Sequence, residues 1–369
     1  MEISDEDNLR LNVLLMQNLL ALRIDESRMQ IFALTDQGEA KIQLSRPSRD
    51  VLYLRKIREL ISDHVMDLPG GYPVFLDRWT RSNQKRDENI LQNLLLLGEP
   101  EAVVAVVHDP DISPELARRA WWAMQAGENA RCLLSNPAII KADIGKEIAA
   151  WLFEFLPFET EPQAIFNSVR LLLQDGLSEQ MMQQQLWQWA QRKATFNIGF
   201  LQAMPDELPE SQPAQQEFEQ IQTDLEALLT KNDPRAALLI KVLSPEGQAF
   251  LHTIKLAMSK LADQETAMAL FDLLGNYFSY FKIIDVKHHN SADACQYSEQ
   301  LIHSDELSEL TRLIPDQDEK ILACLCLAQV EGSLLTSFFS HSRMVGSLMR
   351  RKMSPWTDPL LKHIEQLCS

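Results

Sequence analysis

Cysteine and histidine are the side chains of this chain with the greatest capacity for redox chemistry and metal binding. His288, His289, Cys295 and His303 lie close together in the sequence. Their spacing matches none of the paired-ligand patterns of zinc sites. If this segment were helical, Cys295 and His303 would stand two turns apart. We therefore expect no metal site here, and no bound cofactor anywhere in the chain.

The other cysteines show no sign of activation. Cys324 and Cys326 lie in the segment Ile-Leu-Ala-Cys-Leu-Cys-Leu-Ala, which is apolar all round and predicts a buried helix. Residues two apart on a helix point to different sides, so these two thiols are badly placed to bridge one another. Cys132, Cys295 and Cys368 have no neighbouring motif that would stabilise a thiolate. Five cysteines in 369 residues do not form the dense framework of a small secreted domain, so we expect reduced thiols.

Residues 69–73, Pro-Gly-Gly-Tyr-Pro, hold the one adjacent glycine pair of the sequence. They match neither a phosphate loop nor a dinucleotide-binding fingerprint. A reversal of chain direction followed by a short extended run is the simpler interpretation. Nucleophile-elbow, zinc-protease and Gly-Lys-Ser/Thr motifs do not occur in the sequence either. These patterns predict a protein that is not an enzyme.

Two basic clusters, at 46–58 and 78–86, flank this turn. The surface that they could form with nearby aromatic residues comprises Tyr72, Arg78, Trp79, Arg81, Arg55 and Arg58. A run of charges usually marks a solvated face, and on a helical wheel Arg55 and Arg58 oppose the apolar side. The alternative is a site for an anion, for RNA or for an acidic partner protein.

Trp121 and Trp122 are adjacent in a predicted helix. They would lie ~100° apart around its axis, so one can enter the core while the other borders it. Packing between helices is the simpler interpretation, and an aromatic anchor for a partner is the alternative.

The elements that position these residues begin with a small α+β unit at 1–86. An amphipathic helix is predicted over residues 8–21, followed by a β-hairpin from runs at 29–34 and 40–44. A helix over 49–66 should cover that hairpin, because a lone hairpin is only marginally stable.

From residue 87 onward the sequence predicts helices throughout, so the fold class is mainly all-α. Six helix starts place a polar residue before a proline, at Pro100, Pro114, Pro137, Pro162, Pro234 and Pro245. Proline suits the first helical position, where its missing N–H costs nothing. We predict a helical-repeat domain at 87–203, a loose α-solenoid of HEAT-like helix pairs. A proline-rich acidic linker at 204–213 and an all-helical domain at 214–369 follow.

Composition narrows the possible partners. The formal charge of −17 opposes non-specific binding to nucleic acid or to an anionic bilayer. The N-terminus is acidic where a signal peptide is basic, and no uncharged apolar run approaches ~18 residues. We therefore expect a cytoplasmic protein that does not bind membranes.

Several stretches of this sequence resemble the DsrS family, which accompanies the dissimilatory sulfite reductase system of sulfur-oxidising bacteria. The resemblance covers about residues 8–208, and the C-terminal part matches only weakly. Its blocks are residues 22–26, 69–81, 97–108, 117–124, 154–159 and 199–203. The family resemblance implies a cytoplasmic accessory protein of sulfur oxidation, regulatory or supporting, with no established catalytic residues.

These observations predict a non-enzymatic accessory or regulatory protein that binds a protein of the sulfur-oxidation machinery. One alternative is a sulfur-relay protein that carries persulfide on Cys132, Cys295 or Cys368. Another is an RNA-binding post-transcriptional regulator that uses the basic clusters at 46–58 and 78–86. The sequence leaves the oligomeric state open.

Overall fold

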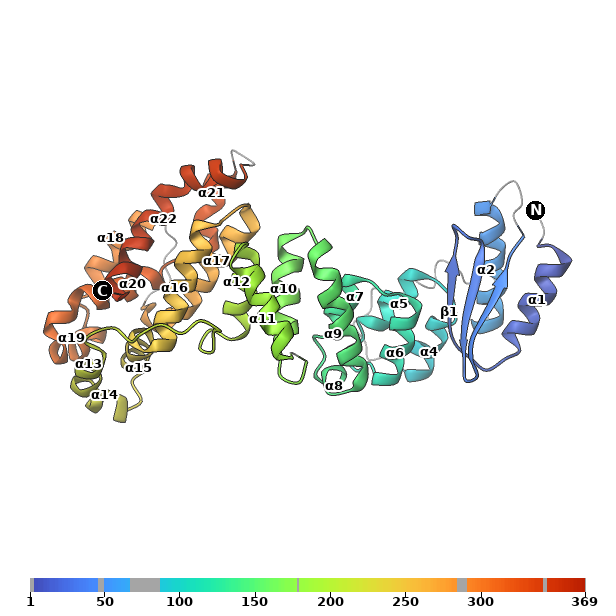
Figure 1. Cartoon of the computed structure of the whole chain (residues 1–369), viewed down its shortest axis with the longest axis horizontal. Coiled ribbons are helices and arrows are strands. Elements are labelled where there is room, and N and C mark those ends of the chain that lie inside the picture. Colours follow the sequence, from blue (N-terminus) through green and yellow to red (C-terminus); the bar gives the residue numbers. More distant parts are fainter. Residues whose placement is uncertain are drawn as a thin grey trace. The chain divides into compact units, whose positions relative to one another are not determined.

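A computed structural model describes residues 3–45, 50–66, 87–177, 179–283, 291–340 and 344–368 (Figure 1). The chain forms two compact units, Met1–Pro157 and Phe158–Ser369. It is mainly helical, with a small antiparallel sheet of three strands near the N-terminus, so the predicted fold class is confirmed at this level. The helical-repeat character and the domain boundaries at 86, 203 and 213 stay predictions.

The first unit begins with the sheet and continues as short helices. Its elements are α1 (Asp5–Leu15), β1 (Leu19–Asp25), β2 (Gln30–Thr35), β3 (Gly38–Gln43), α2 (Asp50–Met66), α4 (Glu88–Leu95), α5 (Pro100–Val107), α6 (Pro114–Ala123), α7 (Gly127–Leu133), α8 (Pro137–Ile140), α9 (Asp143–Phe155) and the 3-10 turn η1 (Leu156–Phe158).

The sheet has the strand order β1-β2-β3, and both pairs are antiparallel. The predicted hairpin is β2 and β3, and the predicted helix over 49–66 is α2, so both are confirmed. The helix predicted over 8–21 is wrong in its second half, because α1 ends at Leu15 and β1 begins at Leu19. Residues 19–25 pair with β2 along the strand, and this tertiary pairing overrides an apolar pattern that suited either element.

Helices α1 and α2 cover one face of the sheet. Leu11 of α1 and Ile57 of α2 are fully buried with Ile31 and Ala33 of β2. Three strands with one apolar face need such a cover to be stable in water. Figure 1 shows both helices beside the sheet.

Asp7 of α1 ties these two helices together. Tyr53 of α2 donates its hydroxyl to Asp7 Oδ2 at 2.5 Å, and the backbone N–H of Ser45 donates to the same oxygen at 2.9 Å. Burial raises the pKa of the Asp7 carboxyl, but these hydrogen bonds outweigh it and hold the pKa below its ordinary value. The carboxylate is therefore a charged, hydrogen-bonded anchor inside the first unit.

Proline begins a helix at all six predicted starts. The side chains of Ser113, Asn136, Asp233 and Ser244 each accept a backbone N–H from the first turn of the helix that follows. Each of these contacts satisfies a donor that a helix start otherwise leaves free. Proline at the first position is therefore common to all six starts, and four of them also have a side-chain cap.

The second unit is helical. Its elements are α10 (Pro162–Leu172), α11 (Gln180–Ala190), α12 (Ala194–Ala203), α13 (Phe218–Asp224), α14 (Glu226–Thr230), α15 (Pro234–Leu243), α16 (Pro245–Ser259), α17 (Gln264–Tyr277), η2 (Ser279–Phe281), α18 (Ser291–Leu301), η3 (Asp305–Leu307), α19 (Ser308–Leu313), η4 (Pro315–Gln317), α20 (Asp318–Ala328), η5 (Gly332–Leu335), α21 (Thr336–Phe339) and α22 (Gly346–Cys368). Residues 204–213 contain no helix.

Two helices form the centre of this unit. In α12, residues 194–201 are all buried, and Gly199 lets the helix approach α10 so closely that a Cβ there would lie 2.4 Å from Val169 Cβ. Helix α20 is buried over residues 323–328, as its uniformly apolar sequence predicts. It packs against both α18 and α22, and this packing positions the cysteine cluster described below.

A partly buried ion pair joins α2 to the start of α5. Arg58 Nε lies 2.5 Å from Glu99 Oε1, and the side chains are 18% and 6% exposed. Arg58 also pairs with Glu26, whose side chain is 61% exposed. Arg58 is therefore neutralised by two carboxylates, whereas the sequence predicted a solvated side chain.

Replacing Glu99 by alanine removes the more buried of the two carboxylates that pair with Arg58, whose own side chain is only 18% exposed. We expect Glu99→Ala to lower the free energy of unfolding by about 2–4 kcal/mol, because removing one member of a largely buried ion pair is costly. Glu26→Ala is the matched control and should cost under about 1 kcal/mol, as exposed pairs do. Urea unfolding followed by circular dichroism measures both, and equal losses would contradict a special role for Glu99.

Candidate functional site

The binding surface predicted from the basic clusters is only partly described. Tyr72, Arg78, Trp79 and Arg81 lie outside the described residues. Arg55 is exposed and pairs with Glu59 at 3.2 Å, and Lys56 reaches the same carboxylate at 2.6 Å. These two cations and Arg58 thus all have carboxylate partners. That surface stays a prediction.

A different group of cations and aromatic rings lies on the sheet face opposite α1 and α2. The register sets Arg23 beside Phe32, and Phe32 beside Lys41. The Arg23 guanidinium carbon is 4.7 Å from the centroid of Phe32 and 5.1 Å from that of Trp122, and Lys41 Nζ is 5.3 Å from Phe32. We call Arg23, Phe32, Lys41 and Trp122 the aromatic–cation row. It is a partly exposed surface in which two cations lie against aromatic rings, and the Glu39 carboxylate borders it at Trp122.

The tryptophan pair behaves as predicted. Trp121 is fully buried and meets Trp151 edge to face at 5.1 Å. Trp122 is half-buried, and its indole N–H donates to Glu39 Oε2 at 3.1 Å. One ring therefore packs in the core while the other fastens α6 to the edge strand.

Strand β3 has an open outer edge. Leu44 N–H donates to Met29 C=O at 2.8 Å, so the even-numbered residues of β3 bond to β2. In an antiparallel pair the alternate residues point their N–H and C=O groups the other way. The backbone of Glu39, Lys41 and Gln43 therefore faces outward, where the described residues place no further strand. One of these groups, Gln43 C=O, accepts a hydrogen bond from Arg10 at 3.3 Å.

A groove runs between α1 and this edge. Its volume is about 560 Å3, and its lining includes Leu9, Arg10, Val13, Lys41 and Gln43. Leu9 and Val13 are 67% and 55% exposed, which is unusual for large apolar side chains. We call this the β3 edge groove. An extended peptide fits such a groove by adding a strand to the sheet.

Part of this surface follows from the strand pattern of the sequence. Once the hairpin is predicted, period-2 alternation places Phe32 and Lys41 on one face and the apolar residues on the other. Only the structure shows that the side chains of Leu9 and Val13 are exposed, because this depends on how α1 packs on the sheet.

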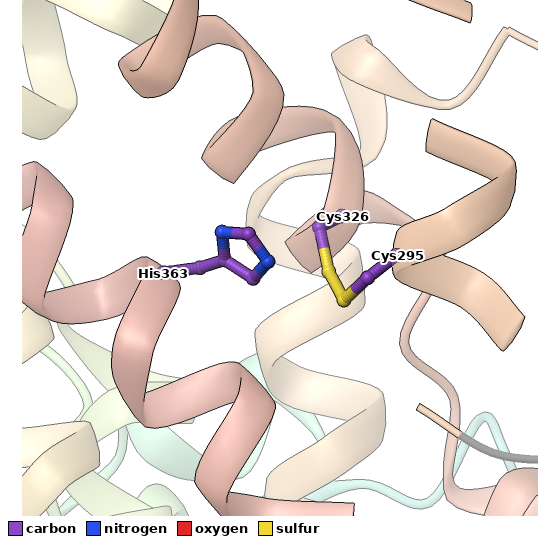
Figure 2. A group of neighbouring side chains, drawn as sticks. All are labelled: Cys295, Cys326 and His363. Atoms are coloured by element: carbon purple, nitrogen blue, oxygen red, sulfur yellow. A yellow bond between two sulfur atoms is a disulfide. The ribbon is translucent and has the colours of Figure 1, made fainter. Parts of the chain in front are cut away.

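The second candidate site joins three helices. Cys295 of α18 and Cys326 of α20 form a disulfide, and Figure 2 shows the His363 ring of α22 turned toward it. We call these three residues the thiol–imidazole cluster. The expectation of reduced thiols is wrong for this pair. Sequence spacing could not reveal it, because the two cysteines are 31 residues apart and meet only through helix packing.

His363 is held in one orientation. Its Nδ1 bonds to Gln366 Oε1 at 2.9 Å, so Nδ1–H donates and Nε2 keeps its lone pair. Burial lowers the pKa of His363 and outweighs the hydrogen bond to Gln366, which favours the charged form. The ring is therefore neutral at pH 7, and one ligand atom from each of the three residues lies within 4.8 Å of the others.

This cluster differs from the grouping considered in the sequence. His288 and His289 lie outside the described residues, and His303 is exposed and does not belong to the cluster. Cys295 instead meets residues that come much later in the chain. Only the packing of α18, α20 and α22 on one another brings them together.

The remaining cysteines are free thiols. Cys324 is fully buried and does not bridge Cys326, as predicted. Burial raises the pKa of the Cys132, Cys324 and Cys368 thiols. All three are therefore poor nucleophiles at pH 7, since the thiolate is the reactive form.

Within the described ranges, no single helix is long and apolar enough to cross a membrane. One bent pair, Pro315–Ala328 with Gly332–Phe339, reaches that length and composition at an angle of 71°. Its first helix contains the buried residues of α20.

In comparisons with known proteins, no family model, no curated protein and no solved structure matches this chain.

The disulfide predicts a thiol count and a stability difference. Unfolding without a reductant should expose three alkylatable thiols, because two of the five cysteines are paired. The double variant Cys295→Ser, Cys326→Ser should lose about 3–4 kcal/mol of unfolding free energy, the loop-closure contribution of a 31-residue separation. Mass spectrometry after alkylation and urea unfolding measure the two quantities. Five reactive thiols would contradict the pairing.

Proposed function

We propose that this protein is a non-enzymatic accessory protein of cytoplasmic dissimilatory sulfur oxidation, and that it acts by binding a partner protein of that system. The resemblance to the DsrS family supports the process. The observation that supports binding is the β3 edge groove, where outward-facing backbone lies beside exposed apolar side chains of α1.

The partner contributes an extended segment that pairs with β3. Its backbone bonds to the outward groups of Glu39 and Lys41, and its side chains alternate between the two faces of the sheet. On one face they meet Leu9 and Val13, and on the other they meet Lys41 of the aromatic–cation row. The chemistry of the groove therefore favours a segment that alternates apolar and acidic residues.

The helices after residue 87 present further surface for this assembly. We propose that helix pairs within 87–203 stack as a loose α-solenoid, in which each pair buries its apolar face on the next. The proline-started helices and their short connections support this arrangement.

RNA is a less favoured candidate partner than a protein. A net charge of −17 repels a phosphate backbone, and the basic residues of α2 already have carboxylate partners. We do not propose persulfide transfer. Cys295 is engaged in a disulfide, and burial disfavours the thiolate of Cys132 and Cys368.

Site-specific cross-linking tests this function. A photoreactive amino acid replaces Val13 in the full chain, produced in its source cells while they oxidise sulfur. We expect a cross-link to a protein of the sulfite reductase system, mapped to an acidic extended segment. Lys41→Pro should lower its yield at least about tenfold, because proline removes an outward N–H without disturbing the β2 pairing. Lys41→Ala keeps that N–H and removes only the charge, so it should lower the cross-link yield less than Lys41→Pro does.

The control places the same photoreactive group at Tyr280, which is exposed in the second unit. Equal cross-linking from positions 13 and 280 would contradict partner binding at the β3 edge groove. Recovery of RNA instead of protein, with binding that falls steeply with added salt, would favour the RNA-binding alternative.

A further inference from the structure

We infer that the thiol–imidazole cluster, when its disulfide is reduced, binds one zinc ion through Cys295, Cys326 and His363. This site is separate from the β3 edge groove and does not depend on the proposed function. Its evidence is the convergence of three ligand side chains from three helices in the second unit (Figure 2).

The distances suit a single ion. Zinc lies about 2.3 Å from a thiolate sulfur and about 2.0 Å from an imidazole nitrogen, so the ligand atoms of a tetrahedral site with two sulfurs and one nitrogen stand about 3.5–3.8 Å apart. The three ligand atoms here lie within 4.8 Å of one another. Opening the disulfide separates the sulfurs toward zinc-site spacing with only small side-chain rotations.

The imidazole is already oriented as a ligand. Metal-bound histidines almost always donate their second N–H to a carbonyl or carboxylate, which fixes the tautomer. Gln366 Oε1 provides this contact to Nδ1 at 2.9 Å, and the other ring nitrogen faces the sulfur atoms in Figure 2.

The ligand set selects the class of metal. Two thiolates and one imidazole suit zinc and leave a fourth position for water, whereas magnesium and calcium require oxygen ligands. Cys295 and His363 are half-buried, so an ion can reach the site from solvent. Cys324 takes no part, because it lies two residues from Cys326 on the same helix and points to a different side.

Zinc binding requires a reductant. A dithiol gives two electrons and two protons to the Cys295–Cys326 disulfide and itself becomes a cyclic disulfide. The two thiols of the protein then lose their protons as they bind the metal ion. Disulfide and zinc thiolate are therefore alternative states of the same two sulfurs.

Cobalt(II) is the spectroscopic probe. The full chain is reduced with a phosphine, because a thiol reductant would itself bind cobalt. Excess reductant is then removed, and the protein is titrated with cobalt. We expect a thiolate-to-cobalt charge-transfer band and the visible bands of tetrahedral cobalt, both saturating at one ion per chain. Zinc should abolish both bands by displacement, and the oxidised protein should show neither.

Matched variants identify the ligands. Cys326→Ser and Cys295→Ser should remove the charge-transfer intensity that their sulfurs supply, and Cys324→Ala and Cys368→Ala should leave the titration unchanged. Gln366→Ala should weaken affinity about 10- to 100-fold while the stoichiometry stays at one, as expected for a residue that only orients the ligand. His363 is half-buried, so His363→Gln removes the imidazole ligand without creating a large cavity in the core. This variant should bind cobalt more weakly than the wild-type chain.

Two results would overturn the zinc site. One is a reduced, folded wild-type chain that shows no charge-transfer band with cobalt. The other is a band that keeps its full intensity in folded Cys326→Ser or is lost in folded Cys324→Ala, since either would place the metal elsewhere. Far-ultraviolet circular dichroism establishes that each variant is folded.

Discussion

The register of the β2–β3 hairpin is the constraint on which the first unit depends. With Thr35 opposite Gly38, one set of side chains faces α1 and α2, and the other forms the aromatic–cation row. The same register turns the backbone of Glu39, Lys41 and Gln43 outward. A shift by one residue would bury Lys41 and expose Ile42, so the buried core and the open edge are determined together. The proposed binding surface is thus a consequence of how the sheet folds.

In the second unit, the corresponding constraint is the packing of α18, α20 and α22. Each helix alone presents an unremarkable residue: a half-buried cysteine, a buried cysteine or a histidine. Their mutual packing turns these residues into a cluster with two exclusive chemical states. Cys326 lies within the buried helix α20, so breaking its bond to Cys295 alters contacts inside the hydrophobic core.

Features with a local cause were predictable from the sequence, and features with a tertiary cause were not. The six proline-started helices, the hairpin, the buried α20 and the split roles of Trp121 and Trp122 follow from caps, turns and periodicity. Strand β1, the Cys295–Cys326 pairing and the burial of Arg58 each depend on residues distant in the sequence. The β3 edge groove was predictable only in part. The hairpin register predicts where Lys41 lies, whereas only the structure shows that Leu9 and Val13 of α1 line the groove.

Residue-resolved amide hydrogen exchange, with and without the partner captured through position 13, tests the central claim most directly. In the free protein the amides of Ala40 and Ile42 should be protected, and those of Glu39 and Lys41 should exchange rapidly. Binding should slow exchange at Glu39, Lys41 and Gln43, because a new strand would cover them. Protection confined to other parts of the chain, or amides of Glu39 and Lys41 already protected in the free protein, would contradict strand addition at β3.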